Sequence, residues 1–128
     1  MDRPLSLLIV DDDPVISTLV SQSLIKAGYQ VERADSAASA LQRLSNPSQP
    51  GFAMVISDVN MPGDSGIKLL QDTRALGLEV PFFFMSGDAI FSEHEQIRAG
   101  ALGFMHKPFS PERLVLKIIL TINSLIAA

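Results

Sequence analysis

The sequence predicts an α/β fold built around a five-stranded parallel sheet. Five short apolar segments recur along the 128 residues, and stretches with apolar residues at helical spacing separate them. Parallel neighbouring strands need crossover connections, which such helices provide on both faces of a sheet. The length suits one hydrophobic core, so we predict a single domain over residues 1–128.

The predicted strands are short enough to be buried on both faces of the sheet. They cover residues 5–10, 30–34, 52–56, 80–85 and 101–105, of which the second is the least apolar. Consecutive strand and helix units of this kind, joined by right-handed crossovers, form a doubly wound sheet. We therefore expect the strand order 2-1-3-4-5.

Five helices are predicted to alternate with these strands. The first three have apolar residues at helical spacing within residues 15–24, 37–44 and 67–76. Gly28 and Gly77 close the first and the third of them, because glycine is the residue that most readily ends a helix.

The last two helices are predicted from their caps. Ser92 and Glu95 form a capping box for a fourth helix that ends near Gly100. Ser110 at the cap and Pro111 at the first helical position begin the fifth helix.

The fifth helix, residues 111–125, has more apolar residues than one buried face requires. Four of them have the spacing of a face packed on the sheet: Leu114, Ile118, Ile122 and Leu125. A second set is left over: Val115, Leu116, Ile119, Leu120 and Ile126. One explanation is a broad stripe buried beneath neighbouring helices, and the other is an exposed patch covered by a partner or a second copy of the chain.

The composition restricts the function. The net charge of −4 and the absence of a basic run argue against direct binding of nucleic acid. There is no cysteine, so disulfides and thiolate zinc sites are excluded. No apolar stretch is long enough to predict a membrane span, and we expect a cytoplasmic protein.

Acidic residues follow two of the predicted strands. Asp11, Asp12 and Asp13 come directly after the first strand, and Asp58 comes just after the third. The expected strand order makes these two strands neighbours, so their carboxylates should meet at one edge of the sheet and favour Mg²⁺. The simpler alternatives are that the run only caps the next helix and that Asp58 is only solvated.

Two further residues are expected at the same edge. The fourth strand leads to Ser86 and the fifth leads to Lys107. A lysine and a metal can neutralise phosphoryl oxygens, a hydroxyl can donate to another, and a carboxylate can act as the nucleophile. The set therefore predicts a phosphoryl site, although each residue alone is more often a turn or surface residue.

With these residues the chain resembles the response-regulator receiver family over essentially its whole length. The resemblance rests on Leu-Ile-Val-Asp-Asp-Asp-Pro at 8–14, on Val-Ile-Ser-Asp-Val-Asn-Met-Pro at 55–62 with Gly66, and on Lys-Pro-Phe at 107–109. It implies a flavodoxin-like fold and, given the size, a chemotaxis-type regulator in two-component signal transduction.

The resemblance also implies roles for individual residues. Asp58 would be the phosphoacceptor, Asp11 and Asp12 the acidic pair for Mg²⁺, Asn60 a metal ligand through its backbone carbonyl, Lys107 the phosphate-binding lysine, Ser86 the switch hydroxyl and Phe104 the switch aromatic. Asp13 has no essential family role, and we assign it to capping or charge. Pro108 would follow a cis peptide bond.

The implied partners are a sensor histidine kinase or histidine phosphotransfer protein and a downstream target protein or output domain. Asn60 and Asp88 lie where side chains flank the path of attacking water in the family, and both are small and polar. We therefore expect fast self-dephosphorylation. The face formed by the fourth helix, fifth strand and fifth helix would bind partners, with a possible homodimer through the fifth helix.

Three other functions compete with this interpretation. A phosphohydrolase with an aspartate nucleophile wants a second carboxylate two residues on, where this chain has Asn60. A flavin carrier would have its phosphate repelled by Asp11 to Asp13. A degenerate receiver would bind partners without phosphorylation. We expect no enzyme, except that the chain would catalyse its own phosphorylation and dephosphorylation.

Overall fold

The computed structural model describes residues 4–48, 51–61, 64–86, 100–106 and 110–127. Its core is one parallel sheet whose strands are β1 (Ser6–Val10), β2 (Gln30–Ala34), β3 (Met54–Asp58), β6 (Phe82–Ser86) and β7 (Gly103–His106). The spatial order is β2-β1-β3-β6-β7, and each neighbouring pair is parallel. The predicted order 2-1-3-4-5 is confirmed.

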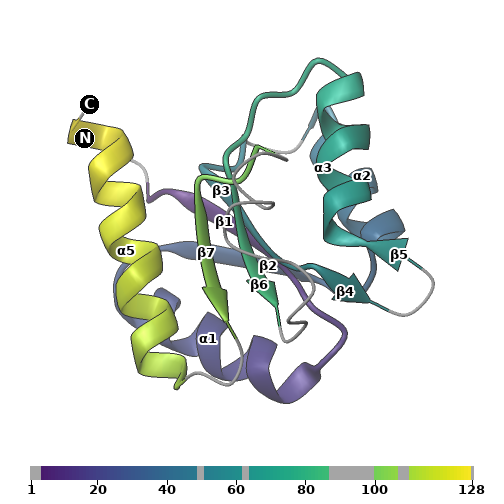
Figure 1. Ribbon diagram of the computed structural model, residues 1–128. Helices are drawn as coiled ribbons and strands as arrows, with labels where there is room; N and C mark the ends of the chain where they lie inside the picture. The colour runs from purple at the N-terminus through teal and green to yellow at the C-terminus, as the bar shows by residue number, and fades with distance from the viewer. Residues whose placement is uncertain (1–3, 49–50, 62–63, 87–99, 107–109, 128) are drawn as a thin grey trace.

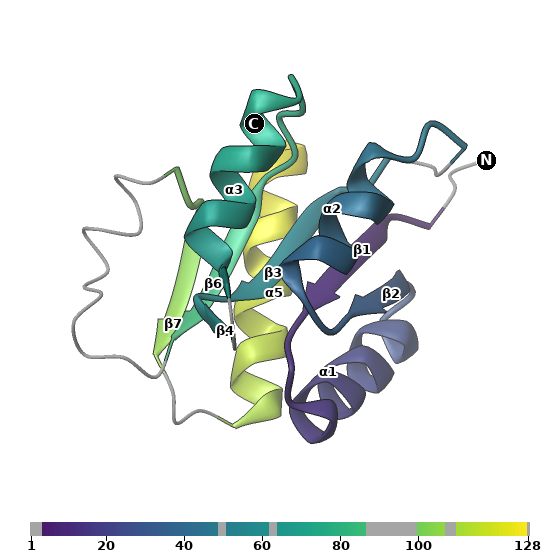
Figure 2. The same ribbon diagram turned by 90° about the vertical axis from the view of Figure 1, so that its right-hand side faces the viewer.

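Helices cover both faces of this sheet (Figures 1 and 2). Helices α1 (Pro14–Lys26) and α5 (Pro111–Ala127) pack together on one face, and α2 (Ala37–Ser45) and α3 (Gly66–Ala75) pack on the other. The predicted fourth helix falls in residues 92–100, and all but its last residue lie outside the described part of the chain. None of the described helices is long and apolar enough to cross a membrane.

Serine and aspartate caps begin the helices, as their short side chains favour. Ser36 accepts a hydrogen bond from the amide of Ser39, and Ser65 accepts one from the amide of Lys68. At α5 the amide of Arg113 donates to the hydroxyl of Ser110, so the predicted cap is confirmed. 

The strand residues alternate between two hydrophobic cores. Residues such as Leu8, Val55 and Phe84 face α2 and α3, whereas Ile9 and Ile56 and their neighbours face α1 and α5. All five residues of β3 are buried. A strand that is covered on both faces explains why these segments are continuous apolar runs.

The strand β3 covers residues 54–58 and thus lies two residues further along the chain than the predicted strand at 52–56. It ends at Asp58 and not at residue 56, because the backbone ladder continues through Ser57 and Asp58, which lie opposite Phe84 and Met85. Backbone pairing does not depend on whether a side chain is apolar. Directly afterwards, β4 (Asn60–Met61) and β5 (Asp64–Ser65) form a small antiparallel pair that the sequence did not predict.

The buried face of α5 differs from the predicted one at two positions. Leu114, Ile118 and Ile122 are buried as predicted, but Leu125 is 37% exposed. Val115, which was not part of the predicted buried face, is buried as well. The helix has 17 residues, and at about 1.5 Å per residue it is longer than the strands that it covers. Its last turn therefore extends past the sheet (Figure 1).

Gly66, the first residue of α3, lies against the end of β3. Its amide donates to the carbonyl of Val59 at 2.8 Å. A Cβ atom at this position would lie 2.4 Å from the carbonyl oxygen of Asp58, 2.8 Å from the Ser57 hydroxyl and 3.1 Å from the Phe84 ring. Only glycine lets the helix approach the strand so closely.

We expect Gly66→Ala to destabilise the protein by about 1–3 kcal/mol, because backbone atoms must move to admit the methyl group. Thermal unfolding followed by circular dichroism measures the change. Gly51→Ala is the matched control, since a Cβ at Gly51 would have no atom within 4 Å. Equal melting temperatures for the two variants would show that the close approach at Gly66 is unimportant.

Candidate functional site

Three carboxylates meet at the carboxyl ends of β1 and β3. One oxygen from each of Asp11, Asp12 and Asp58 lies within 4.8 Å of the other two. Asp11 and Asp58 are buried, and Asp12 is exposed. The sheet places them together because β1 and β3 are adjacent and parallel, so residues far apart in the sequence end at the same edge.

Backbone hydrogen bonds hold the first of these strand ends in place. The amide of Asp11 donates to the carbonyl of Ala34 at the end of β2, at 3.1 Å. The Asp11 carboxylate accepts a hydrogen bond from the amide of Asp13 at 2.9 Å. The chain therefore turns around the Asp11 carboxylate immediately before α1 begins.

Asp13 has a different task from its two neighbours. Its carboxylate accepts hydrogen bonds from the amides of Val15 at 3.0 Å and Ile16 at 3.5 Å, and it is the N-cap of α1. The assignment of Asp13 to capping is therefore confirmed. Because one aspartate satisfies the helix start, helix capping does not account for the other two carboxylates of the run.

Asp58 is fixed from its backbone and its side chain. One carboxylate oxygen accepts from the amide of Asn60 at 3.1 Å. The Ser57 hydroxyl donates to the carbonyl of Asp58 at 2.9 Å, and the next amide, that of Val59, donates to Met85 in β6. The sequence predicted no role for Ser57, which is a single polar residue between the apolar run of residues 52–56 and Asp58.

The structure describes several other predicted site residues only in part or not at all. Ser86 is the last residue of β6, and its backbone lies opposite His106, the residue before Lys107. The side chain of Ser86 and all of Lys107, Pro108 and Asp88 lie outside the described residues. Asn60 is exposed on β4, with its amide directed at Asp58.

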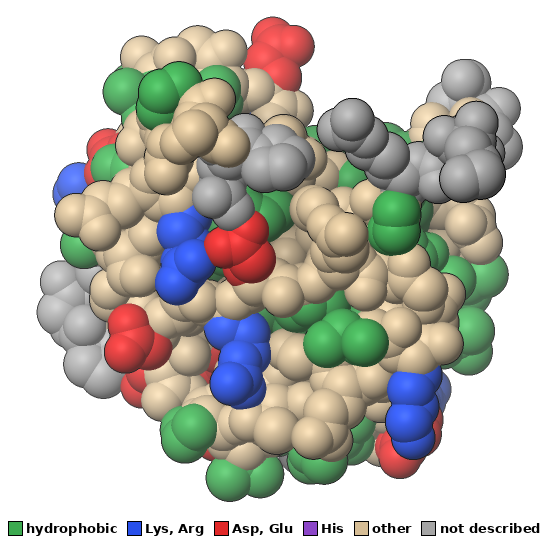
Figure 3. Space-filling model, turned by 180° about the vertical axis from the view of Figure 1, so that it is seen from behind, with side chains coloured by type: hydrophobic (Ala, Val, Ile, Leu, Met, Phe, Trp, Pro, Cys, Tyr) green, Lys and Arg blue, Asp and Glu red, His purple; other side chains and the backbone are tan. Residues whose placement is uncertain are grey.

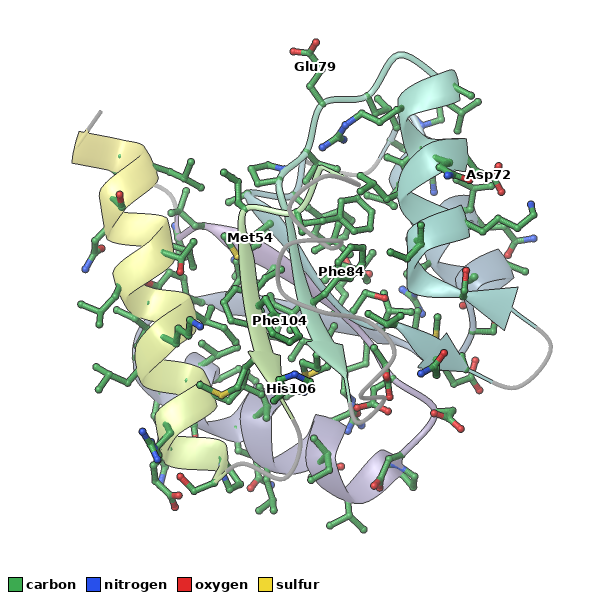
Figure 4. The ribbon with its side chains drawn as sticks, viewed as in Figure 1. Met54, Asp72, Glu79, Phe84, Phe104 and His106 are labelled. Atoms are coloured by element: carbon green, nitrogen blue, oxygen red, sulfur yellow. The ribbon has the colours of Figure 1, made fainter. Side chains whose placement is uncertain are left out.

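Phe104 lies inside the molecule, on the edge strand β7. Its ring is buried and packs edge-on against His106, with centroids 4.7 Å apart (Figure 4). Lys117 of α5 donates from its ammonium group to the carbonyl oxygen of Phe104. The residue predicted to be the switch aromatic is therefore tied to the fifth helix through its backbone.

The three carboxylates suit a hard divalent cation. Like charges held this close repel each other unless a cation lies among them. Mg²⁺ prefers oxygen ligands, keeps several waters and needs only one or two carboxylates from a protein. One exposed and two buried carboxylates at a sheet edge match those requirements.

Comparisons with known proteins agree with this geometry. A family model described as the response regulator receiver domain matches residues 7–119. The chemotaxis response regulator CheY4 of Vibrio cholerae has a similar solved structure, with 31% sequence identity and a TM-score of 0.79 over 94% of this chain and 99% of that one.

Two curated relatives are longer proteins. The uncharacterized transcriptional regulatory protein YrkP of Bacillus subtilis (strain 168) is 37% identical over 114 residues, which are 88% of this chain and 47% of that protein. Protein PetR of Rhodobacter capsulatus is 36% identical over 116 residues, 90% of this chain and 47% of PetR. The chain thus spans about half the length of these relatives. With the family model, the parallel sheet and the carboxylates at its edge, the chain belongs to the response regulator receiver domain family.

Proposed function

We propose that this chain is a phosphorylation-controlled signalling domain in which Asp58 accepts a phosphoryl group in a Mg²⁺-dependent reaction. The observation that carries the proposal is the convergence of the Asp11, Asp12 and Asp58 carboxylates within 4.8 Å. Asp11, Asp12, Asp58 and the backbone carbonyl of Asn60 would hold the metal. When bound, Mg²⁺ would neutralise charge on the transferring phosphoryl oxygens.

The chemistry is a single transfer to a carboxylate. An oxygen of Asp58 forms a bond to phosphorus while the bond between phosphorus and the donor breaks, and the donor leaves with that electron pair. The donor is a phosphorylated histidine of a sensor kinase or phosphotransfer protein, or a small acyl phosphate. Lys107 and Ser86 would contact the phosphoryl oxygens in the product.

In this function the chain acts only on its own Asp58, and it is not a general hydrolase. A hydrolase with an aspartate nucleophile uses a carboxyl group two residues on as general acid, and Asn60 offers only an amide there. Asp58 would return to its free carboxylate when water attacks the phosphorus of the aspartyl phosphate. We propose that the phosphorylated state signals to a target protein or an attached output domain.

Incubation with acetyl phosphate and Mg²⁺ should add one phosphoryl group to the wild-type protein, as intact-mass spectrometry would show. Asp58→Asn should show no addition, because the amide lacks the nucleophilic oxygen charge. Asp12→Ala and Lys107→Ala should slow the reaction by removing metal charge balance and phosphate contact. Undiminished labelling of Asp58→Asn would falsify the proposal, and a chelator should suppress labelling of the wild type.

The phosphorylated state should decay quickly, since the resemblance to the receiver family implies that Asn60 and Asp88 flank the path of attacking water, and both residues are small and polar. Asn60→Leu and Asp88→Leu should each lengthen its lifetime several-fold by obstructing that path. The decay of the phosphorylated mass after removal of the donor measures this. Lys68→Leu on α3 is the control, because Lys68 is exposed and pairs with Asp72. Identical decay in all these proteins would rule out the proposed role of the two positions.

The exposed side of α5 supports the proposed partner face. Leu116 and Leu120 are 58% and 59% exposed, and Leu102 before β7 is 52% exposed. Leu102 and Leu120 line one hollow of about 380 Å³ with Lys117, whose ammonium group holds the backbone of Phe104. An apolar surface next to the proposed switch residue favours binding of a second copy or a target.

Phosphorylation should strengthen self-association through this face. Sedimentation velocity with and without a beryllofluoride phosphate mimic tests it, using Leu116→Glu combined with Leu120→Lys. These exposed positions are better choices than Ile119, which is half-buried against the core. Leu76→Glu, an equally exposed apolar residue after α3, is the control. A wild type that stays monomeric with the mimic at high concentration would exclude the homodimer.

A further inference from the structure

A second polar hollow lies beside the acidic residues, at the β2 edge of the sheet. It has a volume of about 510 Å³ and opens between α1, the end of β2 and the start of α2. Asp11 and Asp12 line one wall, and Arg33, Arg43, Thr18 and other polar residues line the rest. We call this hollow the β2 groove. Figure 3 shows this side of the molecule, where basic and acidic side chains lie close together.

Both arginines of the β2 groove have N–H donors that bond to none of the described residues. Arg33 uses one terminal nitrogen to donate to the Thr18 hydroxyl at 2.7 Å and the Ser17 hydroxyl at 3.4 Å. Arginine has five N–H donors, and the other nitrogens of Arg33 bond to none of the residues that the structure describes. The Nε of Arg43 is buried and also lacks a partner there, although another nitrogen pairs with Glu32.

The hydroxyl groups are oriented by Arg33. Because the oxygens of Ser17 and Thr18 accept from a guanidinium, their own hydrogens are left to be donated elsewhere. Neither hydroxyl donates to another described residue. Ser39, near the start of α2, also lines the groove. One side of the β2 groove is therefore rich in hydrogen-bond donors.

The charges of the β2 groove do not neutralise each other directly. Within the described ranges, Arg33 forms no ion pair, although the carboxylates of Asp12 and Asp35 line the same space. Three carboxylates and two guanidinium groups leave a net negative lining. A divalent cation held by Asp11, Asp12 and Asp58 would offset this negative charge, so we expect anion binding to require the metal.

We propose that the β2 groove binds a small polar phosphate ester, in a manner that depends on Mg²⁺ and rests on the metal site of the proposed function. The phosphate would accept hydrogen bonds from Arg33 and the Thr18 hydroxyl, which charge assistance makes strong. Asp35 would accept from hydroxyl groups of the ligand. The lining contains no aromatic residue, which favours a phosphorylated polyol over a nucleotide. The volume lies within the range of small-molecule sites.

Two-dimensional NMR of the ¹⁵N-labelled full chain tests this, with Mg²⁺ titrated first and glycerol 3-phosphate second. We expect saturable shifts of the Thr18, Arg33 and Ser39 amides that require Mg²⁺, with none for glycerol. Arg33→Gln should weaken binding about tenfold and Thr18→Val about fivefold. Lys68→Gln, which removes an equal charge on α3, should leave binding unchanged, and thermal unfolding checks that each variant folds.

The outcomes separate this site from the phosphorylation reaction. Glycerol 3-phosphate is too weak a donor to label Asp58, so its binding is measured without transfer. If Mg²⁺ itself does not bind, the metal site of the proposed function fails. If Mg²⁺ binds but the ester shifts only amides next to Asp58, or if Arg33→Gln and Lys68→Gln lose affinity equally, the β2 groove is not an anion site.

Discussion

Repulsion among three carboxylates is the constraint on which the rest of the structure depends. Two ionised carboxylates at such a separation repel by about 3 kcal/mol at an effective dielectric constant of about 20. The protein holds them together because the surrounding backbone is already bonded, through Asp11 to Ala34 and through Val59 to Met85. A site held under this repulsion gains stability from a cation and responds to any group that changes its charge.

The rigid sheet and the helices around it have separate tasks. The end of β3 is buried, laddered to both neighbouring strands and closely approached by α3 at Gly66. Asp58 is therefore held at a rigid part of the sheet. The proposed partner surface lies elsewhere, on α5, and this helix is joined to the sheet through Lys117 and the carbonyl of Phe104. The register connects these regions, since Asp58 pairs with Met85, and Ser86 pairs with His106.

Much of the architecture could be predicted from sequence patterns within single strands and helices. Apolar runs and caps such as Ser110 predict where strands and helices lie, because burial and orphan amides impose those residue types locally. The features that were predicted wrongly or not at all depend on what surrounds a helix or strand in the folded protein. Leu125 has the spacing of a buried residue, but the sheet ends before it. The β4 and β5 pair is too short to have a periodicity of its own.

The sequence by itself determined the fold class, the strand order and the convergence of Asp11, Asp12 and Asp58, because parallel strands bring their carboxyl ends to one edge. Only the tertiary structure decided that α3 approaches the end of β3 so closely that position 66 has no room for a side chain. It alone also decided that Arg33 meets Thr18 across the β2 groove. These contacts join residues from different elements, and no spacing along the chain encodes how closely two packed elements approach.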